Sequence, residues 1–361
     1  MYTYFIPIFA QTLGATFFDL GLIGSTVAVT SALAPTFVGY LADRMNRARL
    51  FSFALVMNVV TTVALVFSRS VGDIVLLRLF GGLALGMYST TVEVLITDLA
   101  PIESRVKHMG WYGAATTTGF LIGPILGGFV IQEMGFVRLF FFSAVVSALS
   151  FIPVTIWNLP SCLRREHVVL GFSGVVRTIR GLLPWYMMIA CYGIVYSVVT
   201  TIFPGYANSV GVSVAFIGYL FAAFGISKVF AYATLESYLM LGERRVLLIA
   251  ALLMAIGVVG LGTSASFIGF LAAIMLIGGC SGVIFPITIG LISRHFPDRR
   301  LGAGVGSYET AISIGQAVGP FLAGIVASLT NVGFSFLLMA LFGVLMAIFI
   351  ATGRSHSVGS T

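Results

Sequence analysis

Long apolar runs separated by short polar breaks fill the whole chain. A helix needs about 20 apolar residues to cross a bilayer, whereas the strands of a membrane barrel would alternate apolar and polar positions. The pattern therefore predicts an all-α polytopic membrane protein. After a shorter apolar stretch at 2–13, the predicted spans cover 18–42, 49–68, 72–99, 108–131, 137–158, 184–205, 213–236, 246–264, 267–293, 301–328 and 333–352.

The stretch at 2–13 predicts only part of a first helix. As a helix it would extend about 18 Å, which is less than the roughly 30 Å of a hydrocarbon core. We therefore expect the first helix to be truncated, and an in-frame apolar stretch with basic residues upstream of Met1 would restore it.

The composition excludes two other classes of protein. Hydrophobic types make up 59% of the 361 residues and charged types 9%, against about 25% charged residues in a typical soluble domain. This excludes an ordinary soluble protein, and also a disordered chain, which would need low hydrophobicity and high charge. The net charge of +7 would suggest nucleic acid in a soluble protein, but here it indicates basic cytoplasmic loops and no nucleic-acid partner.

The basic residues are concentrated on one side of the predicted topology. The positive-inside rule makes that side cytoplasmic, and we expect a multi-pass protein of a prokaryotic plasma membrane. Of the 19 Lys and Arg, 15 fall in the stretches placed on this side, which are 44–49, 103–107, 161–183, 242–245, 294–300 and 353–361.

An internal repeat divides the chain into two halves. Shifting the sequence by 196 positions aligns 110–128 with 306–324, and 8 of the 19 aligned positions are identical. Two parallel repeats of this kind are typical of transporters. The predicted domains are an N-terminal helix bundle at 1–160, a basic cytoplasmic linker at 161–183, a C-terminal bundle at 184–352 and a cytoplasmic tail at 353–361.

The sequence contains no pattern typical of a metal site, a nucleotide site or a catalytic centre. The three cysteines form no Cys-X-X-Cys pair, and the four histidines are dispersed beside polar loops. A phosphate-binding loop needs Gly-Lys-Ser/Thr, but neither Lys107 nor Lys228 follows a glycine. We therefore predict no enzyme activity, no cofactor and no metal, and we favour coupling to an ion gradient.

The stretch 39–49 reads Gly-Tyr-Leu-Ala-Asp-Arg-Met-Asn-Arg-Ala-Arg and joins two predicted helices. It resembles the loop signature of the major facilitator superfamily, G-x-L-x-D-R-x-G-R-R/K. Asn46 stands where the signature has Gly but tolerates a positive φ, and Ala48 replaces a basic residue. The resemblance implies a cluster that latches one transport state, formed by Gly39, Asp43, Arg44, Arg47 and Asp98.

Two further elements resemble the same family. Arg78 opens an R-x-x-x-G pattern, and 119–128 match G-x-x-x-G-P-x-x-G-G, which in this family is associated with exporters running as antiporters. Small residues and a proline suit close packing and bending of membrane helices. The expected hinge and packing positions in both copies of the element are Gly119, Gly123, Pro124, Gly127, Gly128, Gly315, Gly319 and Pro320.

The resemblance also implies the overall design. It predicts two pseudo-symmetric six-helix bundles around a central cavity, with transport by rocking of the two halves. The first, fourth, seventh and tenth helices would line this cavity. Tyr192 and Tyr196, one turn apart on the seventh helix, are candidate substrate contacts there, although packing alone would also explain them.

Four ionisable residues inside predicted helices are candidates for coupling, because a charge in a membrane needs water or a partner. Arg78 could hold an anionic group, bias a carboxyl, or extend to the outer headgroups. Lys228 and Glu309 lie at equal depth, which permits either an ion pair or two separate cavity residues. Glu309 is the first candidate proton carrier, since Gly113 stands at the matching position of the other half, and Glu93 is the second.

Together these features predict a monomeric secondary transporter whose partners are a small-molecule substrate, protons or another coupling ion, and the lipid bilayer. Within that class we favour a proton-coupled antiporter that exports drug-like or amphipathic metabolites. Two alternatives stay open, namely a proton symporter importing a sugar or organic anion, and a non-transporting receptor or inactive truncated transporter.

Overall fold

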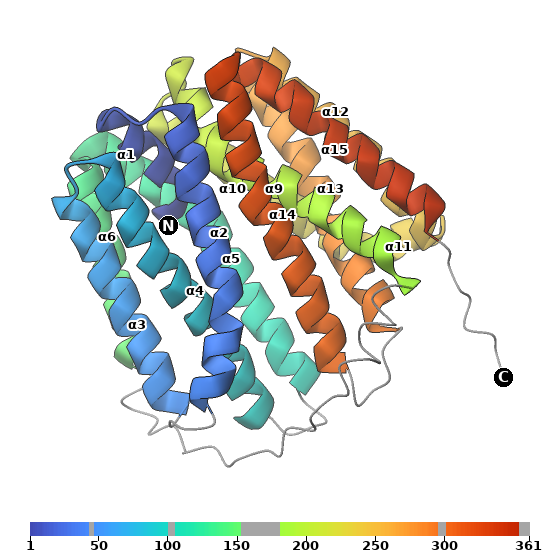
Figure 1. Cartoon of the computed structure of the whole chain (residues 1–361), viewed down its shortest axis with the longest axis horizontal. Helices are drawn as coiled ribbons and strands as arrows, with labels where there is room; N and C mark the ends of the chain where they lie inside the picture. The colour runs from blue at the N-terminus through green and yellow to red at the C-terminus, as the bar shows by residue number, and fades with distance from the viewer. Residues whose placement is uncertain (43–46, 100–104, 153–180, 295–300, 354–361) are drawn as a thin grey trace.

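The computed structural model describes residues 1–42, 47–99, 105–152, 181–294 and 301–353 (Figure 1). Ten helices in this part of the chain are long and apolar enough to cross a membrane, which confirms an all-α, multi-span fold. The first half contains η1 (Thr3–Phe5), α1 (Ile6–Thr12), α2 (Phe17–Ala42), α3 (Arg47–Ala64), η2 (Leu65–Phe67), α4 (Val71–Leu99), α5 (Arg105–Met134) and the shorter α6 (Phe136–Leu149). The second half contains α9 (Leu183–Ser209), α10 (Val214–Ala233), α11 (Leu235–Leu239), α12 (Glu243–Thr263), α13 (Phe267–Ser293), α14 (Leu301–Leu329) and α15 (Val332–Thr352).

Two predicted helices are divided in the structure. The apolar stretch at 2–13 forms a single 3₁₀ turn, η1, followed by the short helix α1. The stretch predicted as one helix over 213–236 ends as α10 at Ala233, and the separate short helix α11 follows. At the break, the hydroxyl of Thr234 donates a 2.8 Å hydrogen bond to the Phe230 carbonyl, a local bond of the type by which Thr competes with regular helix.

Local hydrogen bonds determine where several helices begin. Before α2, the carboxylate of Asp19 accepts a 2.8 Å hydrogen bond from the Thr16 backbone N–H. Before α4, Asp73 accepts from the Ser70 N–H at 2.9 Å, and the Ser70 hydroxyl accepts from the Asp73 N–H in return. Both are reciprocal caps that satisfy backbone groups left unpaired at a helix N-terminus. At α15, Asn331 caps the Phe334 N–H at 2.8 Å.

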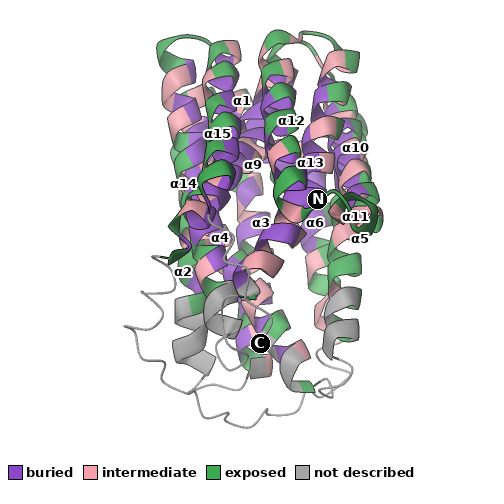
Figure 2. Cartoon of the chain, turned by 90° about the vertical axis from the view of Figure 1, so that its right-hand side faces the viewer, coloured by how far each residue is buried: buried purple, intermediate pink, exposed green. Residues whose placement is uncertain are grey.

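Helix α9 lies at the centre of the molecule, since 72% of its apolar window is buried, more than in any other described span. The surrounding helices have many exposed positions (Figure 2), and a large number of these carry large apolar side chains. Phe53 on α3, Phe129 on α5 and Ile256 on α12 are each more than half exposed. An apolar exterior of this kind suits contact with lipid chains.

The two halves meet along two pairs of helices, α2 against α14 and α5 against α10. Each contact depends on a glycine that faces a proline carbonyl in the other half. Gly21 of α2 abuts Pro320 of α14, and Gly218 of α10 abuts Pro124 of α5, so that a Cβ at either glycine would collide with the backbone. Small residues allow this approach of helix backbones, and the two contacts repeat the twofold relationship between the halves.

Candidate functional site

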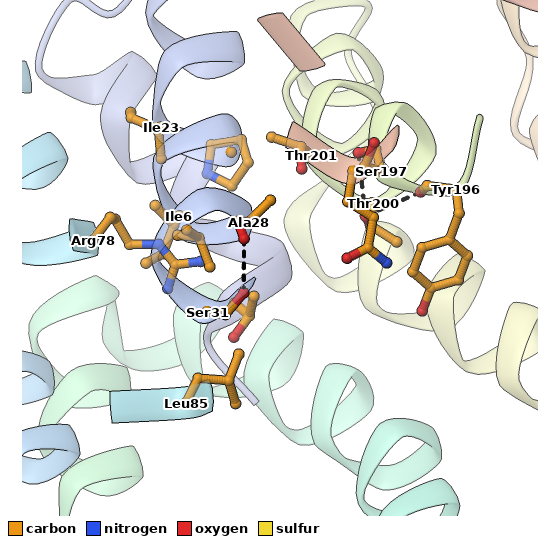
Figure 3. Close-up of a pocket in the computed structure, with 15 residues that line it drawn as sticks. Ile6, Ile23, Ala28, Ser31, Arg78, Leu85, Tyr196, Ser197, Thr200 and Thr201 are labelled. Atoms are coloured by element: carbon orange, nitrogen blue, oxygen red, sulfur yellow. Dashed lines mark hydrogen bonds between the residues drawn. The ribbon is translucent and has the colours of Figure 1, made fainter. Parts of the chain in front are cut away.

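A cavity of about 160 Å³ lies between the two halves. Its walls come from η1, α1, α2 and α4 on one side and from α9 and α14 on the other. In Figure 3, Arg78 reaches in from α4, and Tyr196, Thr200 and Thr201 of α9 lie opposite. Apolar side chains such as Ile6 and Ile23 fill the remaining wall.

The helices that line this cavity differ in part from the expectation. The first, fourth and seventh helices contribute as predicted, but α2 and α14 take the place of the tenth helix, α13. The reason is packing, because α14 lies against both α9 and α2. Gln316 of α14 is thereby brought into the wall, a site residue that sequence reasoning missed. Its spacing of seven residues from Glu309, two turns of helix on one face, is the signal that could have identified it.

Arg78 is directed into the protein and not toward the outer headgroups. Its side chain is only 9% exposed and lines the cavity. The buried Nε has no hydrogen-bond partner among the described residues. The structure therefore places an unpaired guanidinium nitrogen beside the cavity and removes the alternative of an Arg extended to the membrane surface.

Lys228 is surrounded by aromatic rings. Its Nζ lies 5.6 Å from the ring centroid of Tyr196, 5.9 Å from that of Tyr232 and 6.0 Å from that of Phe285. These are distances at which a cation is attracted to the face of a ring. The structure forms no ion pair between Lys228 and Glu309, both of which it describes. The ammonium group of Lys228 is therefore surrounded by aromatic rings and not paired with the carboxylate of Glu309.

The two tyrosines of the seventh helix have different positions. Tyr196 lines the cavity and contacts Lys228 through its ring. Tyr192 is 2% exposed and packs in the core, with its ring centroid 5.9 Å from that of Tyr196. Only Tyr196 is therefore placed to touch a molecule in this cavity.

Glu93 and Glu309 are both exposed, although they lie within long apolar helices. Glu93 belongs to α4 in the first half and Glu309 to α14 in the second, and the two carboxylates are close enough to interact electrostatically. Glu309 also lies on the same face of α14 as Gln316, about 10 Å away along the helix. Each half therefore contributes one carboxylate to this pair.

The glycine-proline elements serve as packing surfaces in both halves. Gly123 and Gly127 of α5 abut Met1 and Phe5, and Gly315 and Gly319 of α14 abut α9. Gly123 and Gly319 are equivalent positions of the repeat. Each copy also contacts the other half, through Gly128 against Val214 and Ala215 and through Pro124 and Pro320 as described above. Among the glycines of the two elements, Gly119 is the one with open space around it.

The predicted loop cluster lies largely outside the described residues. Asp43 and Arg44 belong to the segment 43–46, and the surroundings of Gly39 and the side chains of Arg47 and Asp98 are likewise not described. Within the described part of the chain, no group of His, Cys, Asp and Glu is arranged to hold a metal ion.

Comparisons with known proteins agree with this architecture. The Major Facilitator Superfamily model matches the chain twice, over residues 1–186 and 185–359. An MFS-type transporter of Methanocaldococcus jannaschii is 23% identical over 351 residues, which cover 95% of this chain and 91% of that protein. The quinolone resistance protein NorA of Staphylococcus aureus is 29% identical over 147 residues, 41% of this chain and 38% of NorA.

The fold matches a solved transporter as well. The crystal structure of the nucleoside transporter NupG superposes with a TM-score of 0.75 at 15% identity, covering 98% of this chain and 94% of that one. The twofold family match, the ten apolar spans and the central cavity agree with one another. The chain therefore belongs to the major facilitator superfamily, as an integral multi-pass membrane transporter and not an enzyme.

Proposed function

We propose that this transporter is a proton-coupled antiporter that exports drug-like or amphipathic metabolites. The observation that carries the proposal is that each half places a carboxylate in a long apolar helix, Glu93 in α4 and Glu309 in α14. A carboxyl group that is exposed inside a membrane protein can bind and release a proton. A site shared by both halves is sensitive to their rocking, which is what coupling requires.

Two further features support export. The element at 119–128 matches a pattern associated with exporters, and its small residues pack against η1 and α10. The partial similarity to NorA, a quinolone resistance protein, points the same way. The cavity wall combines apolar residues with Tyr196 and Gln316, which suits an amphipathic molecule.

The direction of transport decides between this proposal and its rivals. Inside-out vesicles containing the protein would be given a proton gradient, acidic inside, and a panel of amphipathic fluorescent compounds. An antiporter accumulates a compound inside as protons leave, and collapsing the gradient releases the compound. Movement of substrate in the same direction as protons indicates a symporter, and no gradient-dependent movement of any compound indicates a receptor or an inactive chain.

We propose that the protein is a monomer and that its two halves, 1–160 and 184–352, rock against each other during transport.

We also propose that the protein lies in a prokaryotic plasma membrane, with residues 44–49 in the cytoplasm and residues 206–212 outside. In a variant without native cysteines, a membrane-impermeant maleimide added from outside should label Ser209→Cys and spare Arg47→Cys. The basis is the concentration of basic residues on one side. Labelling of position 47 but not of position 209 would reverse the topology.

The loop cluster around Asp43 is proposed to latch one transport state. Asp43→Asn should reduce the transport rate while leaving the thermal midpoint of unfolding nearly unchanged. Loss of one latch interaction should shift the balance of states by about 1–3 kcal/mol, or roughly 5- to 150-fold. Transport at the wild-type rate, at equal expression, would show that Asp43 has no latch role.

A further inference from the structure

We propose that the transported molecule carries an anionic group, and that Arg78 holds this group in the central cavity. This inference rests on the proposed transport function and narrows its substrates to organic anions such as carboxylates. It uses three features of the structure: an unpaired buried cation, free hydrogen-bonding groups in the same cavity, and a second cation nearby.

The guanidinium of Arg78 has no anion to neutralise it in the described structure. An arginine keeps its charge at any cellular pH, and a buried charge without a partner is costly. On its own helix, Asp73 caps the first turn, and Glu93 lies about 22 Å further along. On the adjacent α2, Asp19 is bound to the backbone and hydroxyl of Thr16. The described acids nearest in sequence on these two helices are therefore committed elsewhere or distant.

Other residues that line the cavity, from both halves, offer groups that can bind an anion. Ser31, Ser197 and Thr200 donate their hydroxyl protons to carbonyls of their own helices. Among the other lining residues, the side chains of Thr3, Thr201 and Gln316 make no hydrogen bond to any described residue. Two hydroxyls and an amide N–H group are thus available to donate to the oxygens of a carboxylate facing Arg78.

Lys228 adds a second positive charge to the same region. Its Nζ lies 5.6 Å from the ring centroid of Tyr196, and Tyr196 lines the cavity that contains Arg78. Arg78 comes from the first half and Lys228 from the second, and neither pairs with a described acid. An anion would be attracted from both halves at once, whereas a cationic molecule would be repelled by both.

The size and lining of the cavity favour a small amphipathic acid. About 160 Å³ accommodates a charged head with a compact apolar body. Ile6, Ile23 and Leu85 supply the apolar contacts, and Arg78 with Gln316 supplies the polar ones. This combination discriminates by charge through a few polar groups in an otherwise apolar site.

The test compares probes that share one aromatic body and differ in charge. Purified full-length protein in detergent micelles would be titrated with 1-naphthoate, 1-naphthamide and 1-naphthylmethylammonium, with 1-naphthyl phosphate as an alternative anion. We expect an anionic probe to bind, and the amide and ammonium to bind at least about 10-fold more weakly because they lack the charge-assisted contact. Stronger binding of the phosphate than of the naphthoate would identify the anion as a phosphate.

Variants connect the binding to Arg78. Arg78→Gln should weaken binding of the anion by about 10- to 100-fold, and Arg78→Lys, which keeps the charge but loses the planar fork, should lie between. Arg69→Gln is the matched control, since it removes an exposed Arg near the start of the same helix. Equal binding of the ammonium, unchanged anion binding in Arg78→Gln, or no binding of either anionic probe would each overturn the inference. If Arg78→Gln does not fold, Arg78→Lys and the charge series on the wild-type protein decide.

The outcome separates this inference from the proposed function. Binding is measured without any gradient, so Arg78-dependent binding of naphthoate with no proton-driven transport would support the anion site and contradict proton coupling. Proton-driven export of a cationic dye, together with no binding of the anionic probes, would support proton coupling and contradict the anion site.

Discussion

Glu309→Gln should abolish transport driven by a proton gradient while preserving substrate binding and gradient-independent exchange. Gln has nearly the same shape as Glu but cannot release a proton, so the change removes the coupling chemistry and little else. We expect gradient-driven accumulation to fall to the level of protein-free liposomes. The measurement is uptake into proteoliposomes with and without an imposed gradient, beside exchange of labelled for unlabelled substrate at equal pH.

The controls follow from the structure. Glu236→Gln is the matched variant, because Glu236 is an exposed glutamate on the short helix α11, and it should transport normally. Glu93→Gln should reduce coupling less than Glu309→Gln, since Glu93 is the second candidate. Full gradient-driven transport by Glu309→Gln would refute its role and make Glu93 the leading carboxyl.

A purely structural role for Glu309 makes a different prediction. If Glu309 neutralised Lys228, Glu309→Gln would lower the thermal midpoint of unfolding and Lys228→Met would restore it, because the stranded charge would be gone. The structure forms no such pair and places Lys228 over the rings of Tyr196, Tyr232 and Phe285. We therefore expect little loss of stability in Glu309→Gln and no rescue by Lys228→Met.

The sequence was sufficient to predict the spans and the twofold design, because both depend on local pattern. Apolar runs of sufficient length become helices in a bilayer whatever surrounds them, and the shift of 196 positions preserves the glycines that pack each half. The break at Thr234 escaped prediction, since the flanking residues are apolar or helix-forming and no proline or glycine stands at the break.

The site was only partly predictable, because facing directions depend on tertiary packing. The depth of Arg78 in α4 follows from counting residues, but whether its side chain meets lipid or the cavity is decided by how α4 lies against α2. The presence of Gln316 in the cavity wall likewise depends on α14 packing between α9 and α2. The sequence also could not show which of the two tyrosines faces the cavity. They are one helical turn apart, but Tyr192 lies in the core and Tyr196 lines the cavity.

The second large effect is expected when glycines at helix contacts are replaced by alanine. The result should differ between a glycine that packs within one half and a glycine that packs between the two halves. In Gly315→Ala, the new Cβ would meet the Ala190 carbonyl of α9, which belongs to the same half. In Gly218→Ala, it would meet the Pro124 carbonyl across the boundary between halves. Alanine favours helix by up to about 1 kcal/mol over glycine, so any loss must come from the clash. Overpacking of this kind costs about 1–3 kcal/mol.

The two clashes should be relieved in different ways. Within one bundle the helices cannot separate without loss of packing, so Gly315→Ala should lower the thermal midpoint of unfolding. Between bundles, the proposed rocking would let the halves move apart, so Gly218→Ala should retain its midpoint and shift the population toward the state opened at that contact. That shift should be about 5- to 150-fold for the same energy. In a variant without native cysteines, Thr200→Cys in the cavity wall should then react faster with maleimide added from outside.

Gly279→Ala is the control, because no atom lies within 4 Å of a Cβ built at this position of α13. It should change neither the midpoint nor the labelling rate. If Gly218→Ala lowers the midpoint as much as Gly315→Ala and leaves labelling of position 200 unchanged, the α5–α10 contact is part of one rigid core. The two halves would then not separate there, and rocking would have to occur along α2 and α14 alone.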